Sequence, residues 1–400
     1  GAASWWDGGS LIGKFREPAK VESLVNQVGY DIGAPKRFTV QSNFLGEQAI
    51  FEILSLTGES VFAGRLEMAG KISGAYGNDW GSFYYRGDFT EFDRPGKFRI
   101  QVQLDEELSL SWPFEVGEDL IWEQTARPAY EFFYYQRCGM EVPGFHKACH
   151  LDDSIEPGTG EQFDLAGGWH DAGDYNKYHN APYVYGLATA YENVRKDYDR
   201  HDSDSNGRSD FLDEILWGGD FSRRMIAPDG SARGRITSGY GFWGGPEQET
   251  DNLPGTGDER PLEGGVSGLD SSHHTAAMAK IALLIGDKES YFEAAERGFE
   301  WGQTKGLKGP LQLSSALDLY ELTGKEEYAE IAQEILPKVG LGDPFLIEKY
   351  DRLFGEDHSE EVKKALIAEA EGILKHADNP FGVYTYGDAS NPNFFNTPAE

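Results

Sequence analysis

The sequence predicts two domains, an immunoglobulin-like β-sandwich followed by an all-α domain. Up to about residue 116, short runs that alternate apolar and polar side chains are separated by turns of Gly, Pro and Asn, which is typical of strands. From about residue 120, apolar residues recur at helical spacing over many consecutive segments. The 400 residues are enough to bury a core in each domain. We therefore expect a lead-in segment over 1–20, a sandwich over 21–117 and a helical domain over 118–400.

The sandwich should hold about seven strands in about 100 residues, as immunoglobulin-like domains do. The clearest strand patterns cover 23–28, 37–41, 50–54, 81–86 and 97–104. Turn residues separate them, as in the run from Phe92 to Gly96. The sandwich shows no catalytic pattern of its own, so we expect it to support the helical domain.

The domain over 118–400 should be a helical array or toroid, because many helices follow one another in the sequence. Several are joined by turns that contain Gly, which ends helices readily. The expected helices cover 121–137, 180–198, 208–225, 271–286, 289–303, 311–323, 325–337 and 360–377.

Composition limits the partners. Asp and Glu number 68 against 36 Lys and Arg, a formal net charge of −32, which repels nucleic acid and anionic membranes. Such a charge suits a cationic substrate, and it is equally typical of a soluble protein from a salty habitat. No apolar run approaches the roughly 20 residues of a membrane helix. We expect a soluble monomer without an organic cofactor.

The compartment stays open. The chain begins Gly-Ala-Ala-Ser, without a starting Met and without the pattern of a signal peptide. Removal of a leader would imply a secreted or periplasmic protein, whereas a cloning scar would leave the cytoplasm as the alternative.

The run from Gly167 to Tyr178 is the most informative stretch of the chain. It reads Gly-Gly-Trp-His-Asp-Ala-Gly-Asp-Tyr-Asn-Lys-Tyr and carries two carboxylates, Asp171 and Asp174, three residues apart. Glycines suit a tight loop at a cleft, and a probable helix follows. A simpler interpretation is that Asp174 only caps that helix.

This run resembles the catalytic aspartate motif of glycoside hydrolase family 9, the inverting cellulase family. The resemblance extends from about residue 22 to 396, and its specific motifs lie at 137–150, 167–178, 206–214 and 379–387. It implies that the helical domain is an (α/α)6 barrel, a fold of twelve helices, of which the pattern shows eight. It also implies that Asp174 is the general base and that Asp171 orients the same water. Inverting hydrolysis needs such a base and a separate carboxylic acid on the leaving oxygen.

The two cysteines of the chain, Cys138 and Cys149, lie eleven residues apart, with His150 beside the second and His170 beside Asp171. Two thiolates and two imidazoles make a closed tetrahedral zinc site. A disulfide and two unlinked thiols are the alternatives. Zinc-bearing members of family 9 look the same at these positions, and the metal would be structural.

The run from Asp202 to Asp213 has the spacing of a twelve-residue calcium loop. Its last position is Asp rather than the usual bidentate Glu, which indicates weaker or altered coordination. The alternative is a solvated acidic turn that caps the next helix. The expected calcium ligands are Asp202, Asp204, Asn206, the Arg208 carbonyl, Asp210 and Asp213.

Four residues are expected to contact substrate. Tyr240 and Trp243 lie in a Gly-rich loop where aromatic rings can stack on sugars. His274 begins a helix, and as part of a bare His-His pair it could equally be a packing residue. Tyr384 follows an Asn-Pro-x-Gly run that resembles a cleft-lining loop of the family.

The family's general acid is a Glu late in the domain, and no matching context appears before Glu400. Together with the missing helices, this predicts that a C-terminal part of the domain lies beyond the sequence shown.

We expect an endoglucanase-like enzyme acting on β-1,4-linked glucan polysaccharides or oligosaccharides. The main alternative is an exo-β-D-glucosaminidase on chitosan oligosaccharides, which the acidic charge would suit. A non-catalytic carbohydrate-binding protein and a metallohydrolase using His170 and Asp171 as ligands are the remaining hypotheses. The sequence distinguishes neither the sugar nor endo from exo action.

Overall fold

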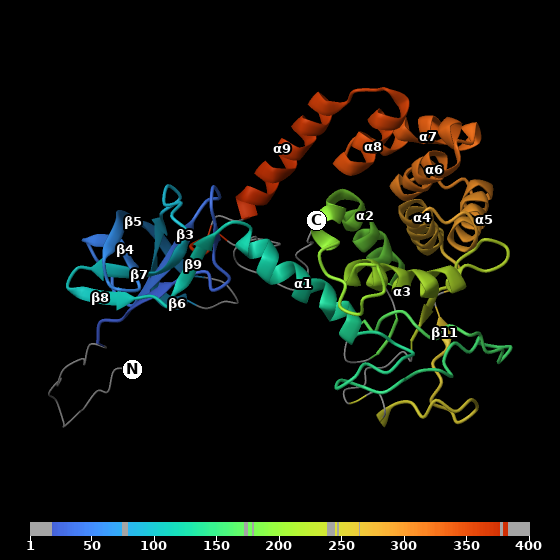
Figure 1. The fold of residues 1–400 in the computed structure, drawn as a ribbon, viewed down its shortest axis with the longest axis horizontal. Helices are drawn as coiled ribbons and strands as arrows, with labels where there is room; N and C mark the ends of the chain where they lie inside the picture. The colour runs from blue at the N-terminus through green and yellow to red at the C-terminus, as the bar shows by residue number, and fades with distance from the viewer. Residues whose placement is uncertain are drawn as a thin grey trace, which may run out of the picture. The chain divides into compact units, whose positions relative to one another are not determined.

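The structure is a computed structural model that describes residues 18–73, 79–171, 175–177, 180–237, 245, 248–263, 265–376 and 379–382. These residues divide into two compact units (Figure 1). One comprises the residues up to Pro128 together with those from Ile367 onward, and the other runs from Ala129 to Leu366.

The first unit contains the predicted β-sandwich. Its strands are β1 (Val21–Leu24), β2 (Tyr30–Asp31), β3 (Arg37–Ser42), β4 (Ala49–Ser55), β5 (Ser60–Ser73), β6 (Asp79–Asp88), β7 (Gly96–Leu104), β8 (Glu107–Leu110) and β9 (Phe114–Gly117). One layer has the order β1-β3-β6-β5, and the other has the order β5-β4-β7-β9-β2, with β8 paired to β7. All pairs are antiparallel except β2 with β9.

Strand β5 belongs to both layers. Its first half, up to Arg65, pairs with β4, and its second half, from Leu66, pairs with β6. Alternating apolar side chains from the two layers meet in one core, which includes Val40, Phe51 and Ile100. The β-sandwich prediction is confirmed, with more strands than the expected seven.

The residues Asn379–Gly382 contact this sandwich. The Thr39 hydroxyl on β3 donates to the Pro380 carbonyl at 3.2 Å, and Arg86 on β6 donates to the Asn379 carbonyl at 2.9 Å. The ring of Phe381 packs edge-on against Tyr84, with centroids 5.3 Å apart. The segment that resembles a cleft-lining loop is thus held at its start by the sandwich.

The helical prediction is confirmed with one addition. The helices are α1 (Leu120–Tyr135), α2 (Asn180–Tyr198), α3 (Asp210–Met225), α4 (Gly268–Ile285), α5 (Ser290–Thr304), α6 (Pro310–Thr323), α7 (Glu326–Val339), α8 (Pro344–Phe354) and α9 (Ser359–His376). Each of the eight expected helices is present within a few residues of its predicted bounds, and α8 was not predicted. A two-stranded sheet, β10 (Arg235–Ile236) with β11 (Leu262–Glu263), lies between α3 and α4 in sequence.

Helix α4 is the buried centre of the second unit. It packs against α2, α3, α5 and α6, and its run from His274 to Ala282 is buried throughout (Figure 1). Small side chains at Ala276, Ala279 and Ala282 let these neighbours approach closely. Among the described residues, no helix combines the length and apolarity that a membrane span requires.

Candidate active site

The segment that leads to Asp171 is fixed by side chains from several elements. The Asn180 side chain at the start of α2 accepts from the Trp169 N–H at 2.6 Å and donates to the Trp169 carbonyl at 3.0 Å. Trp217 on α3 donates to the Gly168 carbonyl at 2.9 Å. Gly168 has φ +70°, and a Cβ there would meet the Asn180 side chain at 2.4 Å, so this position requires glycine.

One buried and one half-buried cation hold the preceding backbone. The Lys177 ammonium donates to the carbonyls of Leu165 and Gly167 at 3.2 and 3.3 Å. Arg224 on α3 donates to the carbonyls of Asp164, at 2.8 Å, and of Ala166. These contacts satisfy carbonyls that no regular structure pairs, and they make the loop rigid.

Glu214 fixes the indole of Trp169 from α3. Its carboxylate accepts from the Trp169 ring N–H at 3.2 Å and pairs with Arg137 at 2.8 Å. Burial raises the pKa of Glu214, although Arg137 opposes the shift. The sequence placed Glu214 in a family-like run without a role, and in the structure it supports the run that contains the predicted catalytic Asp171.

Asp171 is half-buried, and its backbone N–H donates to the Asn176 carbonyl at 2.7 Å. Burial raises the pKa of Tyr183 on α2, and the negative charge of Asp171 raises it further. The predicted base Asp174 lies outside the described residues, as do the predicted substrate contacts Tyr240, Trp243 and Tyr384.

The fourth predicted substrate contact, His274, is buried in α4. It lines a cavity of about 200 Å³ together with Lys177, Asn180 and Asp270. Burial lowers the pKa of His274 to about 4. Its contact with substrate stays a prediction, and in this structure the imidazole serves the packing of α4.

The four predicted zinc ligands come together. Cys138, Cys149, His150 and His170 are all buried, and each places one ligand atom within 4.8 Å of the others. The Cys149 sulfur lies 3.5 Å from the His170 Nε2. Both cysteines are free thiols, so the structure does not contain the alternative disulfide.

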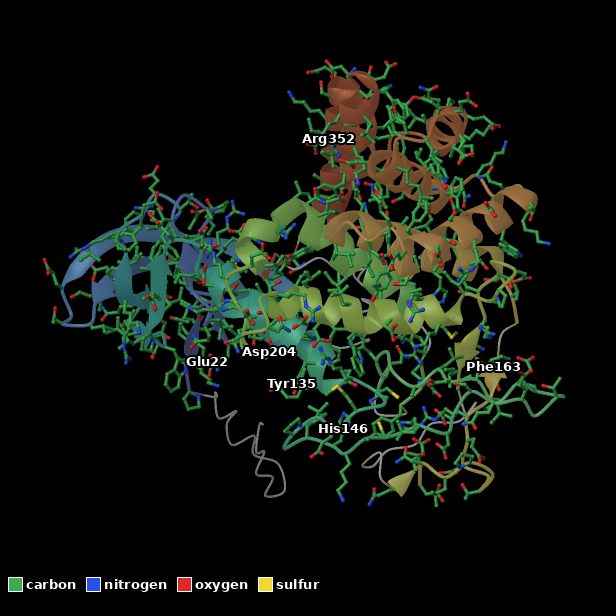
Figure 2. The ribbon with its side chains drawn as sticks, turned by 45° about the vertical axis from the view of Figure 1, so that its right-hand side comes forward. Glu22, Tyr135, His146, Phe163, Asp204 and Arg352 are labelled. Atoms are coloured by element: carbon green, nitrogen blue, oxygen red, sulfur yellow. The ribbon has the colours of Figure 1, made fainter. Side chains whose placement is uncertain are left out.

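Figure 2 labels His146, which lies next to this cluster, and draws sulfur atoms in yellow. The centroid of the His146 ring lies 5.7 Å from that of His170. The His146 Nδ1 is hydrogen-bonded to the Lys147 carbonyl at 2.7 Å. His146 is not part of the group of four.

The ionisable groups of the cluster shift one another's pKa values. The hydrogen bond from Cys149 lowers the pKa of Cys138 well below its ordinary value, whereas the same contact raises the pKa of Cys149. Burial lowers the pKa of His170; burial would also lower the pKa of His150, but its contacts with Cys138 and Glu249 raise it. A zinc ion would require both thiols deprotonated and both imidazoles neutral.

Glu249 and Arg260 join this cluster to the catalytic loop, and sequence reasoning missed both. The Glu249 carboxylate bonds the His150 Nε2 at 3.4 Å and pairs with Arg260, which donates to the Tyr175 carbonyl. All three side chains of this bridge, those of His150, Glu249 and Arg260, are at most 5% exposed.

The predicted calcium loop is compact, and it contains an ion pair. Asp202 accepts from the N–H groups of Asn206 and Gly207, at 3.1 and 2.9 Å. Asp213 accepts from the Asn206 amide at 2.7 Å and pairs with the Arg208 guanidinium at 2.8 Å. This loop is not among the described groups whose ligand atoms all lie within 4.8 Å.

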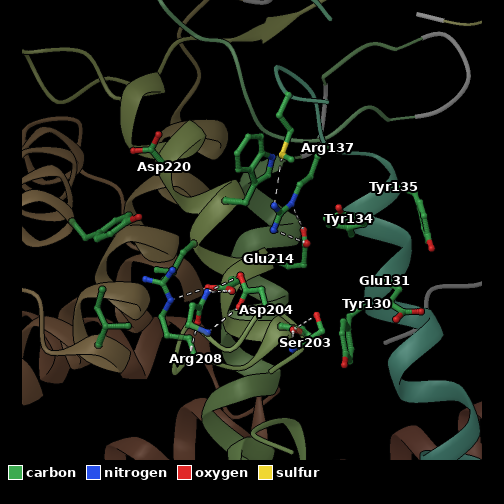
Figure 3. Close-up of a pocket in the computed structure, with 18 residues that line it drawn as sticks. Tyr130, Glu131, Tyr134, Tyr135, Arg137, Ser203, Asp204, Arg208, Glu214 and Asp220 are labelled. Atoms are coloured by element: carbon green, nitrogen blue, oxygen red, sulfur yellow. Dashed lines mark hydrogen bonds and ion pairs between the residues drawn. The ribbon is translucent and has the colours of Figure 1, made fainter. Parts of the chain in front are cut away.

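A cavity of about 840 Å³ lies between α1 and α3 (Figure 3). Aromatic residues of α1, including Tyr134 and Tyr135, form one wall, and Asp204 and Glu214 lie on the other. Asp171 does not line it. This cavity is thus separate from the predicted catalytic carboxylate Asp171.

Comparison with known families gives two matches. The family description "Glycosyl hydrolase family 9" matches residues 122–336, and "Cellulase N-terminal ig-like domain" matches residues 20–107.

Curated relatives carry names from polysaccharide degradation. A cellodextrinase of Butyrivibrio fibrisolvens is 30% identical over 232 residues, covering 54% of this chain and 40% of that protein. Endoglucanase D of Acetivibrio thermocellus is 27% identical over 60% of this chain and 39% of its own length. A xyloglucan-specific endo-β-1,4-glucanase of Bacteroides ovatus is 26% identical over 94% of this chain and 72% of that protein. The chain thus spans about two fifths of the length of the first two relatives.

Solved structures share the fold. An endoglucanase of Alicyclobacillus acidocaldarius aligns with a TM-score of 0.69 at 23% identity, over 91% of this chain and 73% of that one. A structure described as a Zn-binding triple mutant of a family 9 endoglucanase aligns with a TM-score of 0.67 at 20% identity, over 92% of this chain and 73% of that one. The predicted order of a sandwich and an (α/α)6-type helical domain is confirmed by these structures.

Proposed function

The chain belongs to glycosyl hydrolase family 9, and on that premise we propose that it is an inverting hydrolase of β-1,4-glycosidic bonds in glucan-type polysaccharides or oligosaccharides. The observation that carries the proposal is the support of the segment from Leu165 to Asp171, whose backbone is held by Lys177 and by side chains of α2 and α3. A carboxylate that positions a water molecule needs such support. Relatives named endoglucanase and cellodextrinase make glucan the first choice of substrate.

In the proposed mechanism Asp174 removes a proton from the attacking water, and Asp171 accepts a hydrogen bond from the same water and orients it. The water then attacks the anomeric carbon from the face opposite the leaving oxygen, so the configuration inverts. A separate carboxylic acid protonates the leaving oxygen, and we assign no residue to that role.

Replacement of Asp174 tests the assignment in the full-length protein. Asp174→Ala should lower kcat by about 10²–10⁴-fold or more, the range of general base catalysis, with little change in KM. Asp171→Ala should cost less if that carboxylate only orients the water. Asp164→Ala is the matched control, because the Asp164 side chain is 91% exposed just before the motif.

The stereochemical course tests the class of mechanism. Proton NMR of the initial product should show the inverted anomer, and azide or formate should partly restore turnover in Asp174→Ala by replacing the attacking water. A retained product would contradict the assignment, because it requires a carboxylate nucleophile about 5 Å from the acid. Wild-type activity in Asp174→Ala would contradict it directly.

A second candidate, an exo-β-D-glucosaminidase on chitosan oligosaccharides, is favoured by the net charge of −32. A negative surface attracts a cationic sugar, and salt screens that attraction. If glucosamine oligomers are the substrate, KM should rise with NaCl, whereas KM for neutral cello-oligosaccharides should not. Turnover of cello-oligosaccharides alone would exclude this candidate.

We also propose that Cys138, Cys149, His150 and His170 hold a structural zinc ion. The residues fit the metal, since both thiols are free and the buried His150 Nδ1 has no hydrogen-bond partner. Zinc would crosslink three segments in a closed site and leave no position for substrate. Elemental analysis should find about one zinc per chain; a Cys138–Cys149 disulfide without zinc would contradict the proposal.

Calcium in the loop from Asp202 to Asp213 is proposed on the spacing of its ligands. Binding would have to displace the Arg208–Asp213 ion pair. Calcium should therefore raise the melting temperature of the wild type more than that of Asp213→Asn. An equal response in both proteins would contradict calcium binding at this loop.

A further inference from the structure

A second group of potential metal ligands lies outside both predicted sites. Asp152, Asp251 and Asp258 each place a carboxylate oxygen within 4.8 Å of the other two. Asp152 follows the zinc ligand His150 by two residues, whereas Asp251 and Asp258 come from a loop about a hundred residues later. No sequence motif predicts this group, because the spacing between its three members matches no known metal-binding pattern.

Asp152 is the buried member, and one of its oxygens has no partner. Its side chain is 1% exposed. The Oδ1 accepts from the Thr250 hydroxyl at 3.2 Å, but the buried Oδ2 has no hydrogen bond. A buried carboxylate oxygen without a partner costs free energy and is rare in folded proteins. The oxygen therefore indicates a missing ligand.

The loop holds the other two carboxylates next to each other. The Asp251 N–H donates to the Asp258 Oδ2 at 2.7 Å, and the Thr256 hydroxyl donates to both residues, at 3.2 Å to Asp251 and 2.6 Å to Asp258. The Asn252 side chain fastens the same loop to the Asp152 segment, since it accepts from the Leu151 N–H at 3.0 Å.

These three negative charges have no cationic partner among the described side chains. No Lys or Arg forms an ion pair with any of them in the described part of the chain, and the nearby Arg260 pairs with Glu249 instead. Like charges this close repel one another. A divalent cation would reverse that repulsion and supply the partner that the Asp152 Oδ2 lacks.

We propose that Asp152, Asp251 and Asp258 bind calcium. Carboxylate oxygens are hard ligands, which calcium and magnesium prefer and which suit zinc less well beside a thiolate site. Calcium accepts six to eight oxygen ligands in flexible geometry, which suits carboxylates that come from two separate segments. Magnesium demands a near-ideal octahedron and keeps several waters, so it suits this group less well.

The bound ion would tie the loop of Asp251 and Asp258 to the segment that carries Cys149 and His150. That loop also follows Glu249, which bonds the His150 ring. The site thus has a structural role, and it stands independently of the reaction that the enzyme catalyses.

Calorimetric titration with CaCl₂ tests the proposal in the chain as purified, with its zinc retained, after dialysis into calcium-free buffer. Asp251→Asn and Asp258→Asn remove one charge each with little change of shape, on a loop where Asp251 is exposed and Asp258 half-buried. Asp202→Asn and Asp213→Asn are the matched controls in the other acidic loop. Magnesium titration of the wild type completes the set.

We expect a calcium site that both controls retain and whose Kd rises at least tenfold in Asp251→Asn and in Asp258→Asn. Magnesium should bind this site at least tenfold more weakly than calcium. Wild-type affinity and stoichiometry in the two loop variants would overturn the site, as would no calcium binding at millimolar concentration. Equal affinity for magnesium would overturn the choice of ion.

Discussion

Glu249 shows how one side chain can serve two parts of an active site. It bonds the ring of the proposed zinc ligand His150 and pairs with Arg260, which reaches the Tyr175 carbonyl in the catalytic loop. Carboxylates that bond a ligating imidazole fix its tautomer and orientation. Glu249 should therefore affect both the affinity for the proposed zinc ion and the position of the loop that contains Tyr175.

We expect Glu249→Gln to weaken zinc binding by about 10–100-fold, the usual cost of losing such a partner. Competition with a chromogenic chelator measures this without reference to activity. Glu263→Gln is the control, since Glu263 lies on β11 outside this bridge. Unchanged zinc affinity in Glu249→Gln would contradict the role.

His274 makes the stability of the second unit depend on pH. Burial lowers its pKa to about 4, so between about pH 6.5 and 4 the unfolded chain binds a proton that the folded chain does not. The free energy of unfolding should fall as the pH falls through this window, by up to about 3 kcal/mol from this group. In urea titrations His274→Gln should flatten the slope, and a slope equal to that of the wild type would contradict the assignment.

The four side chains of the proposed zinc site were the easiest group to find in the sequence, and the side chains that support them were the hardest. Cysteine is rare in this chain, so Cys138 and Cys149 directed attention to their neighbouring histidines. Glu249 is one of many acidic residues, and it is 99 residues from its partner His150. Only the folded chain identifies which carboxylate reaches the metal cluster.

Helices α2, α4, α6 and α8 meet in a buried ionic cluster. Asp318 on α6 is fully buried and pairs with Lys280 of α4, at 3.0 Å, and with Lys349 of α8. Glu192 on α2 pairs with the same two lysines. Burial alone would lower the pKa of Lys280, but Asp318 and Glu192 outweigh it and raise that pKa.

Asp318→Ala should destabilise the protein by about 3–5 kcal/mol, because it leaves buried ammonium groups undercompensated. Arg352 gives the matched control, because it is exposed and its partner Glu321 keeps an ion pair with Lys349. Arg352→Ala should cost about 1 kcal/mol or less. Chemical denaturation of both variants measures the difference. A similar small loss in both would show that the cluster contributes specificity rather than stability.

At the level of elements, periodicity located the eight predicted helices and missed α8. That helix is short, and the glycines Gly340 and Gly342 before it look like a loop. Asp343 caps it and Pro344 occupies its first turn, a start signal that the pattern contained. Strand β5 was missed because glycines interrupt its alternation, and it needs them where it changes from one layer to the other.

The whole molecule carries more negative charge than its ion pairs offset, a net charge of −32. Self-repulsion of this kind opposes the compact state, and salt screens it. The melting temperature should therefore rise as NaCl increases from about 20 to 300 mM, by roughly 2–4 °C for each kcal/mol gained. Sodium sulfate at the same low ionic strengths should give a similar rise, and a fall in both salts would contradict the explanation.

The contact of Asn379–Gly382 with β3 and β6 has a consequence for the order of folding. The Thr39 hydroxyl is hydrogen-bonded to the Pro380 carbonyl, although the two residues are 341 positions apart in the sequence. About 260 residues separate the end of β9 from Pro380, and a ribosome adds about 5–20 residues per second, so the sandwich is exposed for roughly 13–50 s before its last described partner is made. Because domains generally fold as they emerge, the sandwich should be complete by then. It is then a preformed template on which a late segment of the nascent chain docks.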